Sequence, residues 1–384
     1  MAFRTANSRN PVPLLGRRGL RLVPFLLVFA FSAVHGDTVD SLYLRLQNAL
    51  ELYLQIADKG GWPAVTAGPT IKPGDDDPRV ATLARRLLVT GDLDSWHDDD
   101  QHYNDELRDA VLRFQARHGL ETDALVGKNT LVALNVPVER RIAQLRLNLE
   151  RSRDLFDPEL RNLLLINVPA FEAVFIRDGE IVTRTRVIVG ETDAETPLFK
   201  AQMQHVVINP TWTVPYSIAS KELLPKIKRD PGFLARGGYD VFDRDGQRVD
   251  PAEVDWASLY SNNFPYTLVQ RPGNINELGR IKFLLPNEYG ICMHDTPSKQ
   301  LFAHDSRAFS HGCVRMDNPV GFTESVLETE GWTRDDIVTQ LDTTDTLTIP
   351  LAEPIPVIVV YLTAMVDEEG VVHFYRDIYG RDRG

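Results

Sequence analysis

Apolar positions near residue 40 predict a first amphipathic helix. Over residues 41–57 they recur at steps of three and four, the period that places side chains on one face of an α-helix. The positions are Leu42, Leu46, Ala49, Leu50, Tyr53 and Ile56. Lys59-Gly60-Gly61 is typical of a glycine stop after a helix. Residues 62–78 hold four prolines and three successive acidic residues, and they predict an extended linker.

Residues 78–135 predict three short helices, and residues 137–153 predict an amphipathic helix that connects them to the rest of the chain. Helical spacing marks the first two at Val80, Leu83 and Leu87 and at Leu107, Val111 and Phe114. The third begins near Gly127 and ends at Asn135. The connecting helix has Ile142, Leu145 and Leu149 on one stripe.

The pattern changes to short β-rich runs beyond residue 160. Residues 163–168, 173–176, 181–189 and 205–208 predict strands, with a hairpin turn at 177–180. A last hairpin is expected from residues 355–364 and 371–375 around the turn at 367–370. Residues 161–365 therefore predict a mostly β domain.

A long excursion interrupts this domain at about residues 217–279. It begins as a helix, through Leu223, Leu224 and Ile227, and continues as a stretch rich in glycine, aspartate and proline. Connections of this length in compact domains are commonly lids or binding loops. We interpret it as a substrate-covering subdomain; an insertion without function remains the alternative.

The N-terminus predicts an export signal. Five arginines and no acidic residue precede the apolar run 22–34, and small residues follow before Asp37. This run of thirteen residues is shorter than the about 20 residues that span a bilayer comfortably. We interpret residues 1–36 as a signal peptide that directs the protein to the periplasm, with an uncleaved inner-membrane anchor as the alternative.

Length and charge narrow the function classes. At 384 residues, the chain is long enough for two or three domains of about 100–200 residues each. It has 42 Lys and Arg against 54 Asp and Glu, a net charge of −12. Nonspecific binding of nucleic acid through phosphate neutralisation is therefore disfavoured.

The segment from His294 to Arg315 carries the candidate chemistry. His294-Asp295-Thr296-Pro297 is followed, after a loop, by Ser310-His311-Gly312-Cys313-Val314-Arg315. His311 and Arg315 surround Cys313 with positive charge, which lowers the pKa of a thiol and favours the nucleophilic thiolate. Gly312 removes a side chain beside the sulfur, so a substrate carbonyl can approach backbone N–H groups there.

This arrangement resembles the catalytic signature of the L,D-transpeptidases, the YkuD-type family of cell-wall enzymes. The likeness extends to residues 209–215, which include Trp212, and to the order of the domains. It implies that Cys313 is the nucleophile and His294 the general base. The other ring nitrogen of His294 needs an orienting acceptor, and a nearby backbone carbonyl could serve. It further implies substrate-binding or oxyanion roles for the remaining candidates, Ser310, His311, Gly312, Arg315 and Trp212; a structural role for Arg315 is the alternative.

A second resemblance concerns the helical region. Residues 114–120, followed by Asp123 and residues 126–131, resemble a small three-helix peptidoglycan-binding domain. That family usually has glycine after the aspartate, where this chain has Ala124. Such a bundle either binds peptidoglycan or only braces its neighbour.

The resemblance implies an acyl transfer between peptidoglycan stem peptides. A tetrapeptide donor acylates the cysteine, and a diaminopimelate amine of a second stem peptide accepts, which gives a 3→3 cross-link without a metal or other cofactor. Carbapenem-type inhibitors are expected to acylate the same thiol. The alternatives are a lipoprotein lysine or water as acceptor, and a noncatalytic peptidoglycan-binding scaffold.

The second cysteine, Cys292, stands two residues before His294. In an oxidising compartment the two cysteines could form a disulfide. Since that bond would abolish the nucleophile, we expect Cys292 to be a buried free thiol, and reversible oxidative shutdown is a further hypothesis. Zinc binding by His294, His304, His311 and Cys313 is disfavoured, because their spacing matches no common zinc motif.

The expected fold class is α+β: a mostly β catalytic domain, a YkuD-type β-sandwich with a helical lid insertion, preceded by the three-helix domain. The expected divisions are residues 1–36 (signal peptide), 37–77 (helix and linker), 78–135 (peptidoglycan-binding-like domain), 136–160 (connecting helix), 161–365 (catalytic domain) and 366–384 (C-terminal hairpin or tail).

Overall fold

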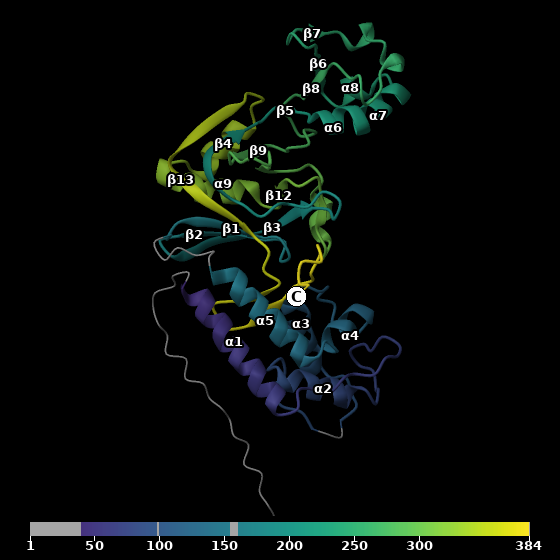
Figure 1. Cartoon of the computed structure of the whole chain (residues 1–384), viewed down its shortest axis with the longest axis vertical. Helices are drawn as coiled ribbons and strands as arrows, with labels where there is room; N and C mark the ends of the chain where they lie inside the picture. The colour runs from purple at the N-terminus through teal and green to yellow at the C-terminus, as the bar shows by residue number, and fades with distance from the viewer. Residues whose placement is uncertain (1–39, 98–99, 154–159, 384) are drawn as a thin grey trace, which may run out of the picture. The chain divides into compact units, whose positions relative to one another are not determined.

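The computed structural model describes residues 40–97, 100–153 and 160–383 (Figure 1). The export signal predicted at residues 1–36 lies outside these ranges. In the described part of the chain, no helix combines the length and the apolar character needed to cross a membrane.

The small helical region has one apolar core. It contains α2 (Val80–Val89), α3 (Asp105–Arg117) and α4 (Lys128–Leu134), and the Asn104 side chain caps α3 by accepting a hydrogen bond from the Leu107 N–H. Residues 62–78 form no helix or named strand, as expected for a linker, but some of their side chains pack into the helical region. Val65 and Ile71 are buried in this same core, and the Asn135 amide makes two hydrogen bonds of 2.8 Å with the Val65 backbone.

Ala124 occupies the turn position where glycine is usual. Its φ is +59°, in the left-handed region that glycine adopts without strain. Its N–H donates to the Gln115 side-chain oxygen at 2.9 Å, and its carbonyl accepts from the Tyr103 hydroxyl at 2.7 Å. These two hydrogen bonds hold an alanine in a conformation that its Cβ disfavours.

Two long helices lie outside this region, and each begins and ends within one residue of its predicted boundaries. They are α1 (Asp40–Asp58) and α5 (Val138–Arg153), and α1 is followed by Gly60 and Gly61 with φ of +96° and +72°. Their apolar faces share a core with one face of the main sheet, because Leu46 and Leu145 cluster with Leu163.

The main sheet has nine strands in the described residues. In the order β11-β3-β12-β10-β9-β4-β13-β1-β2, they are Ala308–Ser310, Glu180–Gly190, Val314–Met316, Met293–His294, Ile281–Leu284, Lys200–Ile208, Leu347–Val360, Leu163–Asn167 and Glu172–Arg177. An additional pairing of β2 with β3 joins distant parts of this order, so the sheet wraps around a core. The strands predicted for residues 163–208 are confirmed.

Strand β1 shows why both faces of the sheet are covered. All five of its residues are buried, and successive side chains of a strand point to opposite faces. Leu164 and Ile166 enter the enclosed core, whereas Leu163 and Leu165 pack on the side of α1 and α5.

Two further helices, which the sequence analysis did not predict, pack against the main sheet. They complete the core that contains Leu164 and Ile166. They are α9 (Pro319–Leu327) and α10 (Arg334–Leu341), and they contribute Phe322, Val326, Leu327 and Ile337. Asn318 caps α9, and a Thr333–Asp336 capping box begins α10. The 3₁₀ turn Glu328–Glu330 lies between α9 and α10, and a further 3₁₀ turn, Lys299–Ala303, precedes β11.

The excursion contains a sheet as well as helices, so its expected description as a helical insertion is incomplete. Its helical parts are α6 (Tyr216–Ile218), a π-helical turn (Ala219–Leu223), α7 (Leu224–Arg229), α8 (Phe233–Arg236), and 3₁₀ turns at Pro251–Glu253 and Trp256–Ser258. Strands β5 (Trp212–Thr213), β8 (Thr267–Gln270), β6 (Tyr239–Phe242) and β7 (Arg248–Val249) form a separate sheet in that order. The insertion has its own apolar core, around Leu224, Val241 and Leu268.

The C-terminal hairpin is shorter than predicted. Residues 355–360 belong to the long strand β13, which pairs in parallel with β1 and antiparallel with β4. The hairpin itself is β14 (Ala364–Val366) with β15 (Val372–Phe374), and it packs in the core that contains α1 and α5.

Candidate active site

Two short neighbouring strands bring Cys313 and His294 together. Strands β10 and β12 are parallel, with Met293 opposite Val314 and His294 opposite Arg315. Cys313 directly precedes β12, so its side chain lies beside the strand that ends in His294. The Cys313 sulfur and a His294 ring nitrogen lie within 4.8 Å of each other.

A backbone carbonyl orients the His294 ring, as the sequence analysis expects. The Nδ1 of His294 hydrogen-bonds the Asp295 carbonyl, and since a carbonyl only accepts, Nδ1 carries the proton and Nε2 is left to accept another. The Asp295 carboxylate accepts a hydrogen bond from the backbone N–H of Arg280 at 2.8 Å and forms an ion pair with the Lys299 ammonium at 2.6 Å. These contacts fix the peptide that positions the imidazole.

The surroundings of Cys313 favour its thiolate. A hydrogen bond from the Cys292 thiol is the largest influence that lowers the pKa of Cys313, and the hydrogen bond and charge of His294 lower it further against the opposing effect of burial. The hydrogen bond with Cys313, followed by burial, raises the pKa of Cys292. Cys313 is therefore the ionised member of the pair.

The loop before Cys313 is shaped by Ser310. Its hydroxyl donates to the Cys313 carbonyl at 2.6 Å and accepts from the Gly312 N–H at 3.1 Å. The Gly312 N–H is thus occupied, whereas the N–H of Cys313 makes no hydrogen bond among the described residues. Of these two groups, the Cys313 N–H is the one available to an oxyanion.

Thr196 and Tyr379 support the same loop and were missed by the sequence analysis. The Thr196 hydroxyl donates to the Gly312 carbonyl and accepts from the Gly190 N–H, both at 2.8 Å. The Tyr379 hydroxyl donates to the Gly190 carbonyl at 2.6 Å and accepts from the Thr196 N–H at 3.2 Å. Thr196 stands 116 positions from Gly312, so no local pattern could have revealed the contact.

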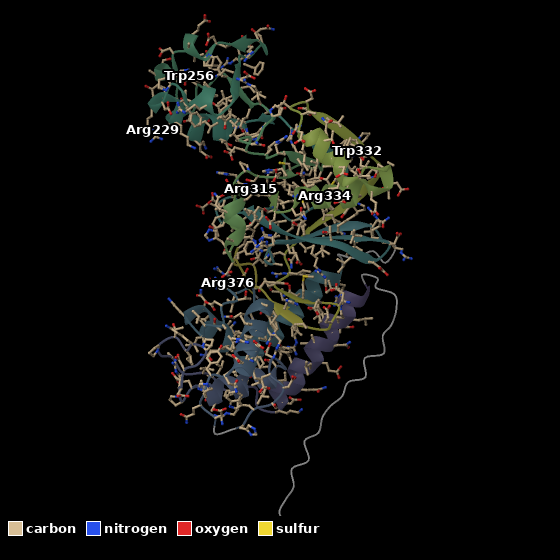
Figure 2. The ribbon with its side chains drawn as sticks, turned by 180° about the vertical axis from the view of Figure 1, so that it is seen from behind. Arg229, Trp256, Arg315, Trp332, Arg334 and Arg376 are labelled. Atoms are coloured by element: carbon tan, nitrogen blue, oxygen red, sulfur yellow. The ribbon has the colours of Figure 1, made fainter. Side chains whose placement is uncertain are left out.

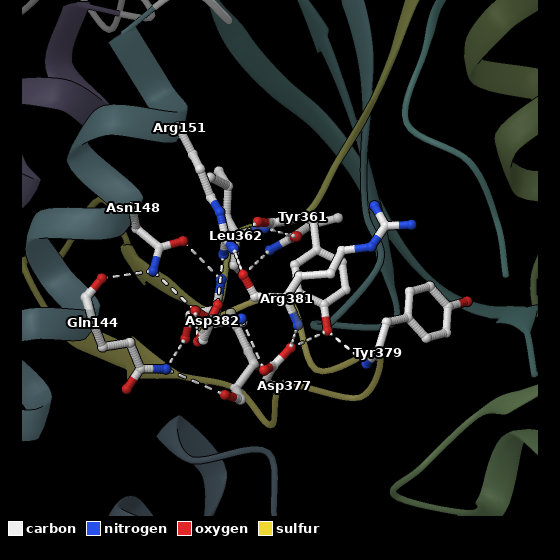
Figure 3. A network of polar contacts seen from close by, with 12 residues as sticks. Gln144, Asn148, Arg151, Tyr361, Leu362, Asp377, Tyr379, Arg381 and Asp382 are labelled. Carbon is white, nitrogen blue, oxygen red and sulfur yellow. Dashed lines mark hydrogen bonds and ion pairs between the residues drawn. The ribbon is translucent and has the colours of Figure 1, made fainter. Parts of the chain in front are cut away.

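A polar network anchors the C-terminal segment that carries Tyr379 (Figure 3). The Tyr379 N–H donates to the Tyr361 hydroxyl at 2.8 Å, which in turn donates to Asp377 at 2.6 Å. Arg151 of α5 pairs with Asp382 at 2.7 Å. The segment is therefore tied both to the sheet and to the connecting helix.

The remaining predicted site residues occupy different surroundings. His311 is exposed and pairs with Glu222 of the π-helical turn at 3.2 Å, a contact between the loop before Cys313 and the insertion. Arg315, labelled in Figure 2, stands opposite His294 in β12, and its buried Nε has no hydrogen-bond partner among the described residues. Burial lowers the pKa of Arg315, partly offset by Glu277 and Cys313. Trp212 lies in β5 and packs against the core of the insertion.

Cys292 is a free thiol, as expected, but it is partly exposed and not buried, and its sulfur lies 3.0 Å from that of Cys313. Residues 289–292 belong to no strand, and β10 begins only at Met293. Gly290 has a φ of +66°, and the Asn287 side chain bonds both the N–H and the carbonyl of Ile291. Cys292 therefore directly follows a turn that the Asn287 side chain stabilises.

One group of potential metal ligands occurs in the described residues: Cys292, His294 and Cys313, whose ligand atoms all lie within 4.8 Å of one another. Two sulfurs and an imidazole suit a soft or borderline ion such as Zn²⁺. The set differs from the one weighed in the sequence analysis, since His304 and His311 are not part of it.

An oriented imidazole next to an ionised cysteine is the arrangement of a cysteine nucleophile. Residues 161–328 match the family model of the "L,D-transpeptidase catalytic domain", YkuD, and residues 76–134 match that of a "Putative peptidoglycan binding domain". The chain therefore carries a YkuD-type L,D-transpeptidase catalytic domain behind a domain of the peptidoglycan-binding type, as the resemblance predicts.

A curated relative agrees with this assignment. A Haemophilus influenzae protein named "Putative L,D-transpeptidase" is 36% identical over 246 residues, which cover 64% of this chain and 49% of the relative. The chain thus spans about half the length of that relative.

Solved structures of L,D-transpeptidases are also similar to the chain, at low identity. One from Stackebrandtia nassauensis is 14% identical, covers 77% of this chain and 96% of its own, and has a TM-score of 0.28. The catalytic domain from Enterococcus faecium acylated by ertapenem is 11% identical, covers 52% and 96%, and has a TM-score of 0.23. Similarity at these scores adds nothing to the assignment.

Proposed function

We propose that the protein is a peptidoglycan L,D-transpeptidase that forms 3→3 cross-links through a thioester on Cys313. The observation that carries the proposal is the orientation of His294, whose Nδ1 is held by the Asp295 carbonyl while its other nitrogen is left for the Cys313 thiol. The match of residues 161–328 to the transpeptidase domain supplies the reaction class.

The first half-reaction is acylation of the enzyme. His294 holds the proton that Cys313 releases on ionising, and the Cys313 thiolate attacks the carbonyl carbon of the third residue of a tetrapeptide donor. A C–S bond forms, and the Cys313 N–H stabilises the oxyanion. Collapse breaks the C–N bond, and the terminal D-alanine leaves with a proton from His294.

The second half-reaction transfers the acyl group. The side-chain amine of diaminopimelate in another stem peptide attacks the thioester, and His294 takes its proton. The new C–N bond forms as the C–S bond breaks, which returns the Cys313 thiolate. No step calls for a metal or an organic cofactor.

Residues around the nucleophile would hold the donor. Arg315 has a buried Nε without a partner in the described residues, which suits a carboxylate or carbonyl of the stem peptide. The contact between His311 and Glu222 places part of the insertion at the loop before Cys313, which supports a substrate-covering role for the insertion. Trp212, at the base of the insertion, is a further substrate-contact candidate.

The helical domain would hold the enzyme on its polymer. Its match to a peptidoglycan-binding family model and the arginine-rich, then apolar, N-terminal sequence favour a periplasmic enzyme, with the first 36 residues as signal peptide or membrane anchor.

The test uses the purified full chain with disaccharide tetrapeptide. Intact-mass measurement should detect an acyl-enzyme on the wild type and none on Cys313→Ala, and the product should be a cross-linked dimer. A tripeptide product would make water the acceptor, and coupling to a lipoprotein lysine would make the enzyme an anchoring transferase; either result overturns the cross-linking assignment. Binding to sacculi without acyl-enzyme or product would favour a scaffold and overturn catalysis.

Carbapenem acylation gives a second readout of the same residue. The wild type should gain the mass of the inhibitor, as the E. faecium domain does with ertapenem. A Cys313→Ala protein that still gains it would contradict the role of Cys313.

A further inference from the structure

The backbone around the two cysteines has the spacing of a disulfide. Cys292 and Cys313 each stand one residue before the paired residues Met293 and Val314 of two parallel strands. The Val314 N–H donates to the Cys292 carbonyl at 2.9 Å, which continues the pairing to the cysteines. Neighbouring strands lie about 4.7–4.9 Å apart, inside the range of about 4.4–6.8 Å between the Cα atoms of disulfides.

The side chains also face each other. The two sulfurs are 3.0 Å apart, and the Cys292 N–H points at the Cys313 sulfur at 3.3 Å. Both cysteines are free and partly exposed, so small oxidants and reductants can reach them. The acyl transfer outlined above gives the Cys292 sulfur no bond to make or break.

We propose that Cys292 is a resolving cysteine, which traps an oxidised Cys313 as an intramolecular disulfide. The proposal rests on the assignment of Cys313 as the nucleophile. The disulfide removes the sulfur from acyl transfer and protects it from further oxidation, so the enzyme is switched off reversibly instead of being destroyed.

The chemistry balances with a hydroperoxide as oxidant. The Cys313 thiolate attacks the O–O bond, which breaks, and sulfenic acid forms as alkoxide or hydroxide leaves. The Cys292 thiol then attacks the sulfenic sulfur; the S–S bond forms and water leaves. A dithiol reductant reverses the process, becoming oxidised as it returns two thiols.

The alternative role for Cys292 is to pack beside Cys313 and donate a hydrogen bond, without chemistry of its own. Serine at this position keeps a donor of similar size and cannot form a disulfide. Cys292→Ser therefore separates the two roles, and the activity of each protein is compared with its own untreated value.

The experiment oxidises the reduced full chain with hydrogen peroxide in the presence of a chelator, which keeps metal off the two sulfurs. In the wild type, intact mass should fall by two hydrogens, and peptide mapping should show residues 292 and 313 joined. In Cys292→Ser, Cys313 should instead gain oxygen and pass to sulfinic acid, which dithiothreitol does not reverse. After excess peroxide, the wild type should then recover about tenfold more acylation by tetrapeptide than the variant.

Two results separate this inference from the proposed function. If Cys313 gains oxygen equally in both proteins while Cys292 stays alkylatable, the resolving role is overturned, whatever the activity. If the disulfide forms completely and acylation of the chain by tetrapeptide persists, the pairing stands, but the shutdown and the nucleophile assignment both fail.

Discussion

The Thr196 hydroxyl donates a hydrogen bond to the Gly312 carbonyl, 2.8 Å away. The same oxygen accepts from the Gly190 N–H, so one buried side chain links the end of β3 to the peptide directly before the nucleophile. Because Cys313 must reach a carbonyl carbon while staying next to His294, we infer that Thr196 is a positioning residue.

Replacing Thr196 with valine should slow acylation more than it weakens donor binding. Valine keeps the shape but leaves a buried N–H and a buried carbonyl without partners, at about 1–3 kcal/mol. Displacement of the nucleophile by even about 1 Å costs on the order of 100-fold in rate. Steady-state kinetics with tetrapeptide should show a lower kcat and a nearly unchanged KM.

Thr196→Ser is the matched control, since it keeps the hydroxyl and loses only a methyl group. It should retain most of the wild-type kcat. Equal kcat values for the valine and serine variants would show that the hydroxyl does not position the loop.

The pH dependence of Cys313 alkylation should show how much Cys292 and His294 lower the pKa of its thiol. Its pKa is lowered first by Cys292 and then by His294, so the thiolate persists below the ordinary pKa of about 8.5 and is lost only as pH falls through the lowered value. Hydrogen bonds to charged groups contribute about 1.5–3 kcal/mol, which corresponds to about 1–2 pH units. Cys292→Ala should therefore raise the inflection of iodoacetamide alkylation by that amount.

Two further substitutions compare the contributions of Cys292 and His294 to the pKa of Cys313. Cys292→Ser keeps a donor and should shift the inflection less than Cys292→Ala. His294→Ala should also raise it, and should abolish acylation by tetrapeptide. An inflection that stays at the wild-type pH in both alanine variants would contradict the account of the thiolate.

Gly312 should tolerate no side chain. Its φ is +106°, and an added Cβ would lie 3.1 Å from the Ile291 Cδ1, so Gly312→Ala strains the backbone by about 1–3 kcal/mol. The strain falls on the peptide next to Cys313. Acylation by tetrapeptide should fall by about 100-fold or more, measured by rapid-quench intact mass.

Gly246→Ala is the control that separates general backbone strain from strain placed next to Cys313. Gly246 also has a left-handed φ, +77°, with no atom within 4 Å of an added Cβ, and it lies between β6 and β7 of the insertion. It should lower the thermal midpoint while acylation remains near the wild-type rate. A similar loss of acylation in both variants would mean that general destabilisation, not the loop before Cys313, is responsible.

The sequence predicts Cys313 as nucleophile and His294 as base because the two residues lie within one contiguous segment whose residue types have a direct chemical meaning. It cannot predict Thr196 or Tyr379, whose contacts join residues 116 and 189 positions apart. Strand β13 was recognised only from residue 355, because Pro350 and Pro354 interrupt the pattern where the register shifts. Helices α9 and α10 did leave a local signal, in the capping residues Asn318 and Thr333.

The stability of the helical domain should depend on the buried ion pair of Arg117 and Asp92. Their side chains are 7% and 3% exposed, and the guanidinium contacts both carboxylate oxygens, at 2.6 and 2.5 Å. Asp92→Asn keeps the shape but leaves the cation without its counter-charge, which costs about 3–5 kcal/mol for a buried pair. Urea unfolding followed by far-ultraviolet circular dichroism should show an early transition for the helical signal. Asp109→Asn, which breaks the exposed pair with Arg108, should leave the curve unchanged; superimposable curves for the two variants would show that the buried pair does not hold the domain together.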